Sequence, residues 1–381
     1  MLKTWLSVLL LLPLTAPAAI AEERRTAPTS AITLDESGLP VVSVTLHSMK
    51  SWNTTRTFRF LLDTGASCCI VDRSVPSEFF WDEPQTETTT TDIANQRITA
   101  PTVLLKRVEV GTVIRDGVFA TRMDLRNQIG RFQDQPVDGI LGMTFLQGTR
   151  FLLDPKAKRL VWWDYHFSPG VAVPLSETPG GPWISLRIGN QEVLATVDTG
   201  MSGGVDLPLA LKPKGAAQAT VSIGLSGVGV AGSEVLVNRL EAGSSAWVQL
   251  PVGFQSEDKT GRIGIDVWMA APVCFDFITN HVTFSPDAAG NLPIRREPSR
   301  NLPLQWDRSG STPRLLVLLV KPGSAMEKAG CKPGDELIQA GALRGLTLTR
   351  RGVQDLVASG IQHVWVVRRN GLELKLGFGP S

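Results

Sequence analysis

The sequence predicts a mainly β protein in which two similar β-barrel lobes are followed by a small α+β domain. Three observations predict this fold class. The triplet Asp-Thr-Gly occurs twice, each time after a short apolar run, and the segments that follow also correspond. Glycine and proline, 36 and 25 of the 381 residues, separate short runs of alternating apolar residues, which is typical of strands joined by turns. Beyond residue 285 the composition changes, which indicates a further domain.

The first segment, residues 1–21, predicts an export signal. Lys3 supplies the positive end, the stretch from Leu6 to Leu14 the apolar centre, and Ala19-Ile20-Ala21 a small-x-small cleavage site. The apolar stretch is short for a membrane span. We therefore expect an exported protein, periplasmic or secreted, with no membrane attachment after the signal is cleaved. Whether a further pro-segment is removed stays open.

The duplicated triplets define the two lobes. The first is Asp63-Thr64-Gly65 and the second is Asp198-Thr199-Gly200, an offset of 135 residues (198 − 63). Each is followed by a second shared segment, Ile140-Leu141-Gly142 and Arg262-Ile263-Gly264, at an offset of 122 residues (264 − 142). Such a repeat indicates that one compact unit was duplicated. If the two halves fold alike, a pseudo-twofold axis brings the two aspartates face to face.

Short strands are predicted throughout both lobes, which we place at residues 30–166 and 167–285. Residues 41–46 and 183–188 alternate apolar and polar side chains with period two, and residues 103–110 continue the first lobe as a strand. This spacing favours two barrel-like lobes over a parallel sheet with crossover helices.

These residues resemble the motifs of the pepsin/retropepsin superfamily, specifically those of bacterial secreted retropepsin-like aspartic peptidases. The resemblance spans roughly residues 35–285. It implies a bilobal aspartic endopeptidase whose catalytic pair is Asp63 and Asp198, one from each lobe. It also implies that Thr64 and Thr199 hydrogen-bond across the lobe interface and hold the two turns together.

The resemblance assigns supporting roles to two glycines, and two residues depart from the pattern. Gly65 and Gly200 let backbone N–H groups approach the carboxylates, which a Cβ atom would obstruct. Met201 follows the second glycine where a small residue is usual, and Arg262 stands where an apolar residue is expected. These departures leave an alternative, an exported non-catalytic peptide-binding or scaffold protein built on a degenerate protease fold.

The resemblance further implies a flap, a hairpin that closes over the substrate. The threonine-rich stretch 87–91 lies at its place in the first lobe, and the glycine-rich stretch 224–229 at the corresponding place in the second. The chain has a single tyrosine, Tyr165, outside both stretches, so no flap residue is assigned by type. The substrate-binding residues stay unknown.

The expected chemistry follows from electrostatics. Two carboxyl groups at close range cannot both ionise, so they share one proton. Aspartic proteases are the known example of such a pair. The charged member activates a water that attacks a peptide carbonyl, and the protonated member stabilises the oxyanion. The expected substrate is therefore a peptide or protein. Both aspartates lie in one chain, so we expect a monomer to hold a complete site.

Other function classes receive no support. The formal charge of +2 points to neither nucleic acid nor an anionic membrane. The four histidines are scattered, and neither a Cys-x-x-Cys pair nor a His-Glu-x-x-His motif occurs, so we expect no metal and no cofactor. The cysteines Cys68, Cys69, Cys274 and Cys331 allow three disulfide pairings, and free buried thiols are an equal alternative.

The C-terminal part predicts a separate module. Residues 286–303 are rich in Pro, Arg, Asn and Gly and predict a linker, and residues 304–381 resemble a bacterial PDZ domain. The resemblance rests on a buried-strand pattern at 315–320, a Pro-Gly-Ser-Ala helix start at 322–325, and a second helix over 351–358.

PDZ domains bind an extended peptide as an added strand beside a helix. The segment expected to hold the peptide carboxylate, residues 308–313, does not match a Gly-Leu-Gly-Phe loop. A peptide ligand and a purely structural cap therefore stay open as roles of this module.

Overall fold

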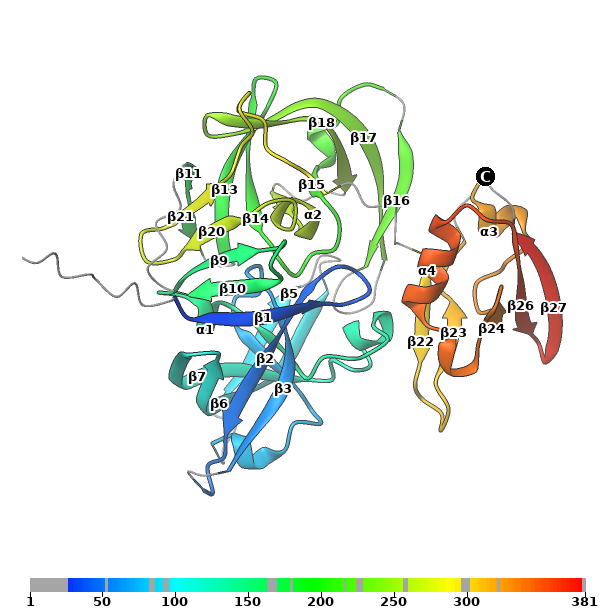
Figure 1. Ribbon diagram of the computed structural model, residues 1–381, viewed down its shortest axis with the longest axis horizontal. Coiled ribbons are helices and arrows are strands. Elements are labelled where there is room, and N and C mark those ends of the chain that lie inside the picture. The colour runs from blue at the N-terminus through cyan, green and yellow to red at the C-terminus, as the bar shows by residue number, and fades with distance from the viewer. Residues whose placement is uncertain are drawn as a thin grey trace, which may run out of the picture.

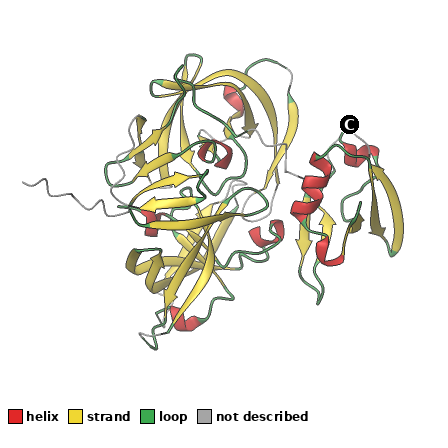
Figure 2. Cartoon of the chain, viewed as in Figure 1, coloured by secondary structure: helices red, strands yellow, loops and turns green. Residues whose placement is uncertain are grey.

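The computed structural model describes residues 27–51, 54–81, 86–91, 96–162, 170–178, 181–215, 217–223, 229–255, 260–295, 302–320 and 323–378. The chain is mainly β, with 52% strand and 11% helix. Figures 1 and 2 show two β-rich halves in contact and a smaller unit beside them. The predicted export signal and residues 224–228 of the second glycine-rich stretch lie outside the described residues.

The first half is a closed ring of six strands. Its strands pair in the order β2-β3-β8-β4-β7-β6, and β6 pairs again with β2. The ring strands are β2 (Pro40–His47), β3 (Thr55–Leu62), β4 (Cys69–Asp72), β6 (Arg97–Val110), β7 (Val113–Met123) and β8 (Gly139–Leu141). Alternation of buried and exposed residues along β2 shows why this sequence forms a half-buried strand. β5 (Thr86–Thr91) extends β6 as a hairpin.

The second half repeats this ring. Its strands pair in the order β13-β14-β19-β15-β18-β17, and β17 pairs again with β13. They are β13 (Gly181–Ile188), β14 (Gln191–Val197), β15 (Val205–Pro208), β17 (Gly229–Ala242), β18 (Ser245–Gln255) and β19 (Gly261–Ile263). β12 (Ser176–Thr178) pairs with β13, and β16 (Gln218–Ile223) pairs with β17 as β5 does with β6.

Strands from both halves meet in one sheet. Its order is β11-β21-β20-β9-β10-β1, with β1 continuing into the first ring. The bounds are β1 (Thr29–Leu34), β9 (Arg150–Asp154), β10 (Arg159–Trp162), β11 (Val171–Pro174), β20 (Val273–Asp276) and β21 (His281–Phe284). At the junction Phe151 of β9 lies opposite Phe275 of β20, with stacked rings 5.0 Å apart. One continuous hydrophobic core therefore runs through both halves.

The short helices sit at turns. In the two halves they are α1 (Met143–Leu146), α2 (Ile265–Trp268) and the 3-10 turns η1 (Ser77–Phe79), η2 (Ile129–Phe132) and η3 (Leu209–Leu211). α1 and α2 follow β8 and β19 directly, so they occupy equivalent places in the duplicated unit.

The C-terminal unit has its own sheet and its own core. Its elements are β22 (Leu304–Asp307), β23 (Arg314–Val317), α3 (Ala325–Lys328), β24 (Glu336–Ala340), β25 (Leu343–Arg344), η4 (Gly345–Thr347), α4 (Arg350–Ala358), β26 (His363–Arg369) and β27 (Leu372–Phe378). Both predicted helices are present. The strand predicted over 315–320 is shorter and ends at Val317, although the N–H of Leu318 still donates to the carbonyl of Pro303 in the same register.

This unit docks on the first half through hydrogen bonds made by Asp134 and Arg308. The carboxylate of Asp134 accepts hydrogen bonds from the backbone N–H of Arg350 at 2.7 Å and from the indole of Trp306 at 2.9 Å. It thereby caps the first turn of α4, where free N–H groups attract a negative charge. The guanidinium of Arg308 donates to the carbonyls of Gly130 and Gln133, both at 2.7 Å.

Part of the segment predicted to be a linker is packed against the second half. Leu292 is buried in the main core, and its N–H donates to the carbonyl of Ala246 at 2.7 Å. The N–H of Arg295 donates to the carbonyl of Asp266 at 2.9 Å. The polar composition of this stretch concealed a buried anchor, so the residues up to 295 extend the second half.

Candidate active site

Each Asp-Thr-Gly turn begins where a ring strand ends. β3 runs parallel to β8, and the N–H of Asp63 donates to the carbonyl of Leu141 at 3.1 Å. β14 runs parallel to β19, and the N–H of Asp198 donates to the carbonyl of Ile263 at 3.0 Å. The two aspartates therefore leave their strands under the same backbone constraint, as the repeat predicted.

Two buried threonines bind the turns to each other. The hydroxyl of Thr64 donates to the carbonyl of Val197 at 2.6 Å and accepts from the N–H of Thr199 at 3.1 Å. Reciprocally, the hydroxyl of Thr199 donates to the carbonyl of Leu62 at 2.8 Å and accepts from the N–H of Thr64 at 3.0 Å. Neither threonine is exposed to solvent. Four hydrogen bonds thus fix the distance between the two aspartates.

The glycines of the triplets allow the carboxyl groups to face each other. A Cβ atom on Gly65 would lie 2.5 Å from Cγ of Asp198, and one on Gly200 would overlap the carboxyl of Asp63. Each aspartate also accepts the N–H of its own glycine at 2.9 Å. Glycine is required because each turn packs on the opposite carboxyl group.

The two carboxyl groups interact as a pair. A hydrogen bond joins them, and both side chains are only partly exposed. Burial raises the pKa of Asp63, and the neighbouring charge of Asp198 holds it well above its ordinary value. Burial also raises the pKa of Asp198, but the positive charge of Arg262 opposes the rise. The pair therefore holds one proton over a range of pH where isolated aspartates hold none.

The segment after each strand supports its turn in the same way. The N–H of Met143 donates to the carbonyl of Ala66, and the N–H of Ile265 donates to the carbonyl of Met201, both at 2.9 Å. The contact uses only the backbone of Met201, which explains why a large residue is tolerated after the second glycine.

The second departure from the pattern, Arg262, has a partner that the sequence reasoning missed. In the first half Ile70 of β4 lies opposite Ile140 of β8, and both are buried. At the corresponding place in the second half, Asp206 of β15 lies opposite Arg262 of β19. A cross-strand pair of opposite charge thus replaces an apolar pair. An isolated acid between apolar neighbours, Val205 and Leu207, was the signal available in the sequence.

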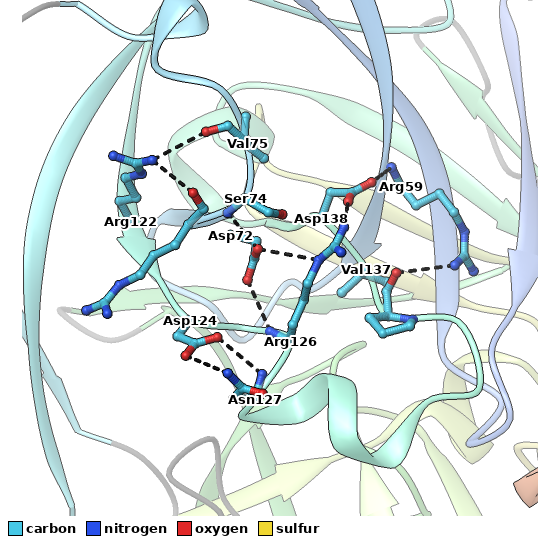
Figure 3. Close-up of polar contacts among 12 residues, drawn as sticks. Arg59, Asp72, Ser74, Val75, Arg122, Asp124, Arg126, Asn127, Val137 and Asp138 are labelled. Carbon is cyan, nitrogen blue, oxygen red and sulfur yellow. Dashed lines mark hydrogen bonds and ion pairs between the residues drawn. The ribbon is translucent and has the colours of Figure 1, made fainter. Parts of the chain in front are cut away.

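The first half carries a polar network of its own around Asp72 and Asp138 (Figure 3). Asp72, which ends β4, is buried, and Arg126 bridges it to Asp138 at 3.5 and 2.9 Å. Asp138 precedes β8 and also accepts the N–H of Arg59 on β3 at 3.0 Å. The network ties together three strands that position Asp63.

All six residues predicted from the triplets are brought together, namely Asp63, Thr64, Gly65, Asp198, Thr199 and Gly200. The hairpin expected at 87–91 is present as β5 paired with β6, and the hydroxyls of Thr88 and Thr102 lie 2.6 Å apart across it.

The four cysteines are free thiols. Burial raises the pKa of Cys69 and Cys274 to about 11 and that of Cys331 to about 12. These three thiols stay protonated at neutral pH, where a thiol is a poor nucleophile.

Within the part of the chain that the structure describes, no three His, Cys, Asp or Glu side chains are arranged to hold a metal ion. Over the same residues, no helix combines the length and apolarity that crossing a membrane requires.

Comparison with known proteins bears on the first half. No curated protein matches the chain. Residues 42–145 match the family model described as aspartyl protease, a range that includes the first triplet and its supporting segment Ile140-Leu141-Gly142. The match, together with the mainly β fold, supports an aspartyl protease family and hence a protease hydrolase.

Proposed function

We propose that the protein is an aspartic endopeptidase in which Asp63 and Asp198 activate one water between them. The observation that carries this proposal is the mutual arrangement of the two turns. Two carboxyl groups share a hydrogen bond, and four threonine hydrogen bonds fix the turns that bear them. An arrangement this symmetric has no evident structural purpose, because burying two carboxyl groups side by side destabilises the fold.

The proposed reaction needs the singly protonated pair. The charged carboxylate accepts a proton from the water, and the water oxygen attacks the carbonyl carbon of the peptide bond. The protonated carboxyl donates a hydrogen bond to the developing oxyanion. The proton taken from water then passes to the leaving amine nitrogen as the C–N bond breaks. Thr64, Gly65, Thr199 and Gly200 keep the two carboxyl groups at a fixed separation.

The proposed organisation has two lobes and a PDZ domain. The six-stranded rings support lobes at residues 30–166 and 167–295, and the separate core supports a PDZ domain at 304–381. That domain would bind a peptide or a partner as an added strand. Arg308, within the segment expected to hold the peptide carboxylate, donates to the first half instead, which favours a role in docking for this residue.

Location and assembly complete the proposal. The N-terminus has a positive charge, then a short apolar stretch, then a small-x-small cleavage site. This order supports export to the periplasm or beyond. Both aspartates come from one chain, which supports activity as a monomer. The substrate is a peptide or protein, and no cofactor is required.

The decisive test replaces each aspartate by asparagine. Asp63→Asn and Asp198→Asn should each lower peptide cleavage by about 10³-fold or more, because asparagine can neither share the proton nor carry the charge. The effects should not add, because the pair acts as one unit. Cleavage of a diverse peptide mixture is followed by mass spectrometry of new termini across pH, with and without pepstatin.

The exposed residue Asp116 provides the matched control, since Asp116→Asn removes a carboxylate far from the pair in sequence and should leave cleavage unchanged. Circular dichroism verifies folding of each variant. Near wild-type cleavage by either folded variant of the pair would overturn the aspartic mechanism and favour a non-catalytic peptide-binding groove.

A further inference from the structure

The two aspartates occupy nearly identical backbone settings, yet their charged surroundings differ. Both accept the N–H of their own glycine at 2.9 Å, and both donate their own N–H to the following β8 or β19 strand. Nothing in this shared geometry decides which of them holds the proton. A residue that acts on only one of the two is needed to decide it.

Arg262 is placed to act on Asp198. It precedes Ile263, whose carbonyl accepts the N–H of Asp198 at 3.0 Å, and it pairs in register with Thr196, two residues before Asp198. Its side chain is partly buried, where charges are screened less than in water. Its charge is the largest of the effects that oppose the burial of Asp198.

Asp206 lies opposite Arg262 and is itself held in place. Its carboxylate accepts the amide of Gln255 at 2.7 Å and packs on Gly253, where a Cβ atom would collide with it. The equivalent residues of the first half, Ile70 and Ile140, carry no charge. The charged pair is therefore a feature of one half alone.

Other ionisable groups on the packed elements are few. β4 carries Cys69 and Asp72, and Asp72 is paired with Arg126. β15 carries Asp206 and α2 carries Asp266, whereas β8 and α1 carry none. β3 carries Arg56 and Arg59, and β14 carries Glu192. Within the described residues, Arg262 is the one cation on β8 and β19, the strands whose carbonyls accept the N–H groups of the two aspartates.

We propose that Arg262, held opposite Asp206, is a positioning residue that fixes the negative charge of the pair on Asp198 and the shared proton on Asp63. As the ionised member, Asp198 then accepts the proton of the water, and Asp63 donates to the oxyanion. The catalytic consequence rests on the proposed peptidase function, whereas the placement of the charge does not.

The test is a pH titration of the full chain with two readouts. Arg262→Leu removes the cation, so Asp198 should ionise at higher pH. The acid limb of the kcat/KM profile should move up by about one pH unit, the size expected for one nearby opposite charge. Carboxyl ¹³C NMR, assigned with Asp63→Asn and Asp198→Asn, should show the same upward shift. Arg262→Lys keeps the charge and should restore the wild-type profile.

Two further variants serve as controls for the Arg262→Leu titration. Arg187→Leu removes an exposed arginine of the same half and should shift neither readout. If Arg262→Leu does not fold because Asp206 loses its opposite charge, the double variant Asp206→Ile/Arg262→Ile copies the apolar pair of the first half and should show the upward shift. Unchanged pH limbs and NMR titrations in a folded variant overturn the inference. If Arg262→Leu shifts the carboxyl NMR titration as expected but the wild-type protein cleaves no peptide, only the proposed function is overturned.

Discussion

The first and second halves of the molecule agree in what positions the aspartates and differ in what surrounds them. In both halves a ring strand ends at the aspartate, and a threonine hydroxyl accepts a backbone N–H of the other half. In both, a glycine stands where the opposite carboxyl group approaches. The first half has a charged network around Asp72 and Asp138. The second places a charged pair, Asp206 and Arg262, beside the aspartate itself.

This difference separates two requirements. Geometry is symmetric because each turn is the packing partner of the other, so a change in one displaces both. Charge is not symmetric, because Arg262 acts on Asp198 whereas the first half has an apolar pair, Ile70 and Ile140, at the corresponding place. The predictions below test whether the symmetric part responds symmetrically and whether the asymmetric part does not.

Among the predictions that compare the two halves, the largest effect is expected at the glycines. Gly65→Ala and Gly200→Ala each place a methyl group against the opposite carboxyl, and 1 Å of misplacement can lower the rate by about 10²-fold. Both variants should lose cleavage by about that factor, as measured by kcat on one peptide.

Gly377→Ala is the matched control, because no atom lies within 4 Å of the added methyl group. It should cleave at the wild-type rate. A full loss for Gly65→Ala beside normal activity for Gly200→Ala would contradict the symmetric packing of the turns.

A smaller effect, on stability, is expected at the threonines. Thr199→Val removes the hydroxyl and leaves the N–H of Thr64 and the carbonyl of Leu62 buried without that partner, which costs about 2–4 kcal/mol. Thr64→Val should cost a similar amount, measured by urea unfolding.

The double variant should cost less than the sum of the two, because the residues share one network. Thr89→Val, at an exposed threonine pair of the β5–β6 hairpin, should change the free energy of unfolding by less than about 0.5 kcal/mol. Additive losses would show that the two hydroxyls stabilise the fold independently.

The smallest effect is expected in the network present only in the first half. Arg126→Met removes the link between Asp72 and Asp138 and should lower the free energy of unfolding by about 1–2 kcal/mol, since Asp72 keeps the backbone N–H of residue 126. The pH limits of cleavage should not move, because the groups that act most on the pKa of Asp63 and Asp198 do not include Arg126. A shift of those limits would place the network among the groups that set the charge of the pair.

Much of the fold was readable because its signals are local. Alternation predicted β2 and β13, and the Asp-Thr-Gly triplets with their apolar-glycine partners predicted the six residues that meet at the site. The duplication allowed residues 135 apart to be placed together without a contact map.

The rest depended on contacts that leave no local pattern. Asp134 reads as an ordinary loop acid, yet it caps a helix 216 residues later in the chain. Leu292 lies in a polar stretch and gives no periodicity, so its burial was invisible to a reading based on composition. Arg262 was recognised as unusual, but its meaning required the cross-strand register that places Asp206 opposite it.

The sheet that joins β9 to β20 has a consequence for how the chain tolerates cutting. Phe151 and Phe275 belong to different halves but stack in one core, and each threonine hydrogen-bonds to the other half. The covalent connection between the halves is therefore redundant once the protein has folded. We expect a nick between residues 162 and 170 to leave two fragments that stay bound to each other, so that the nicked protein elutes as one species in size-exclusion chromatography.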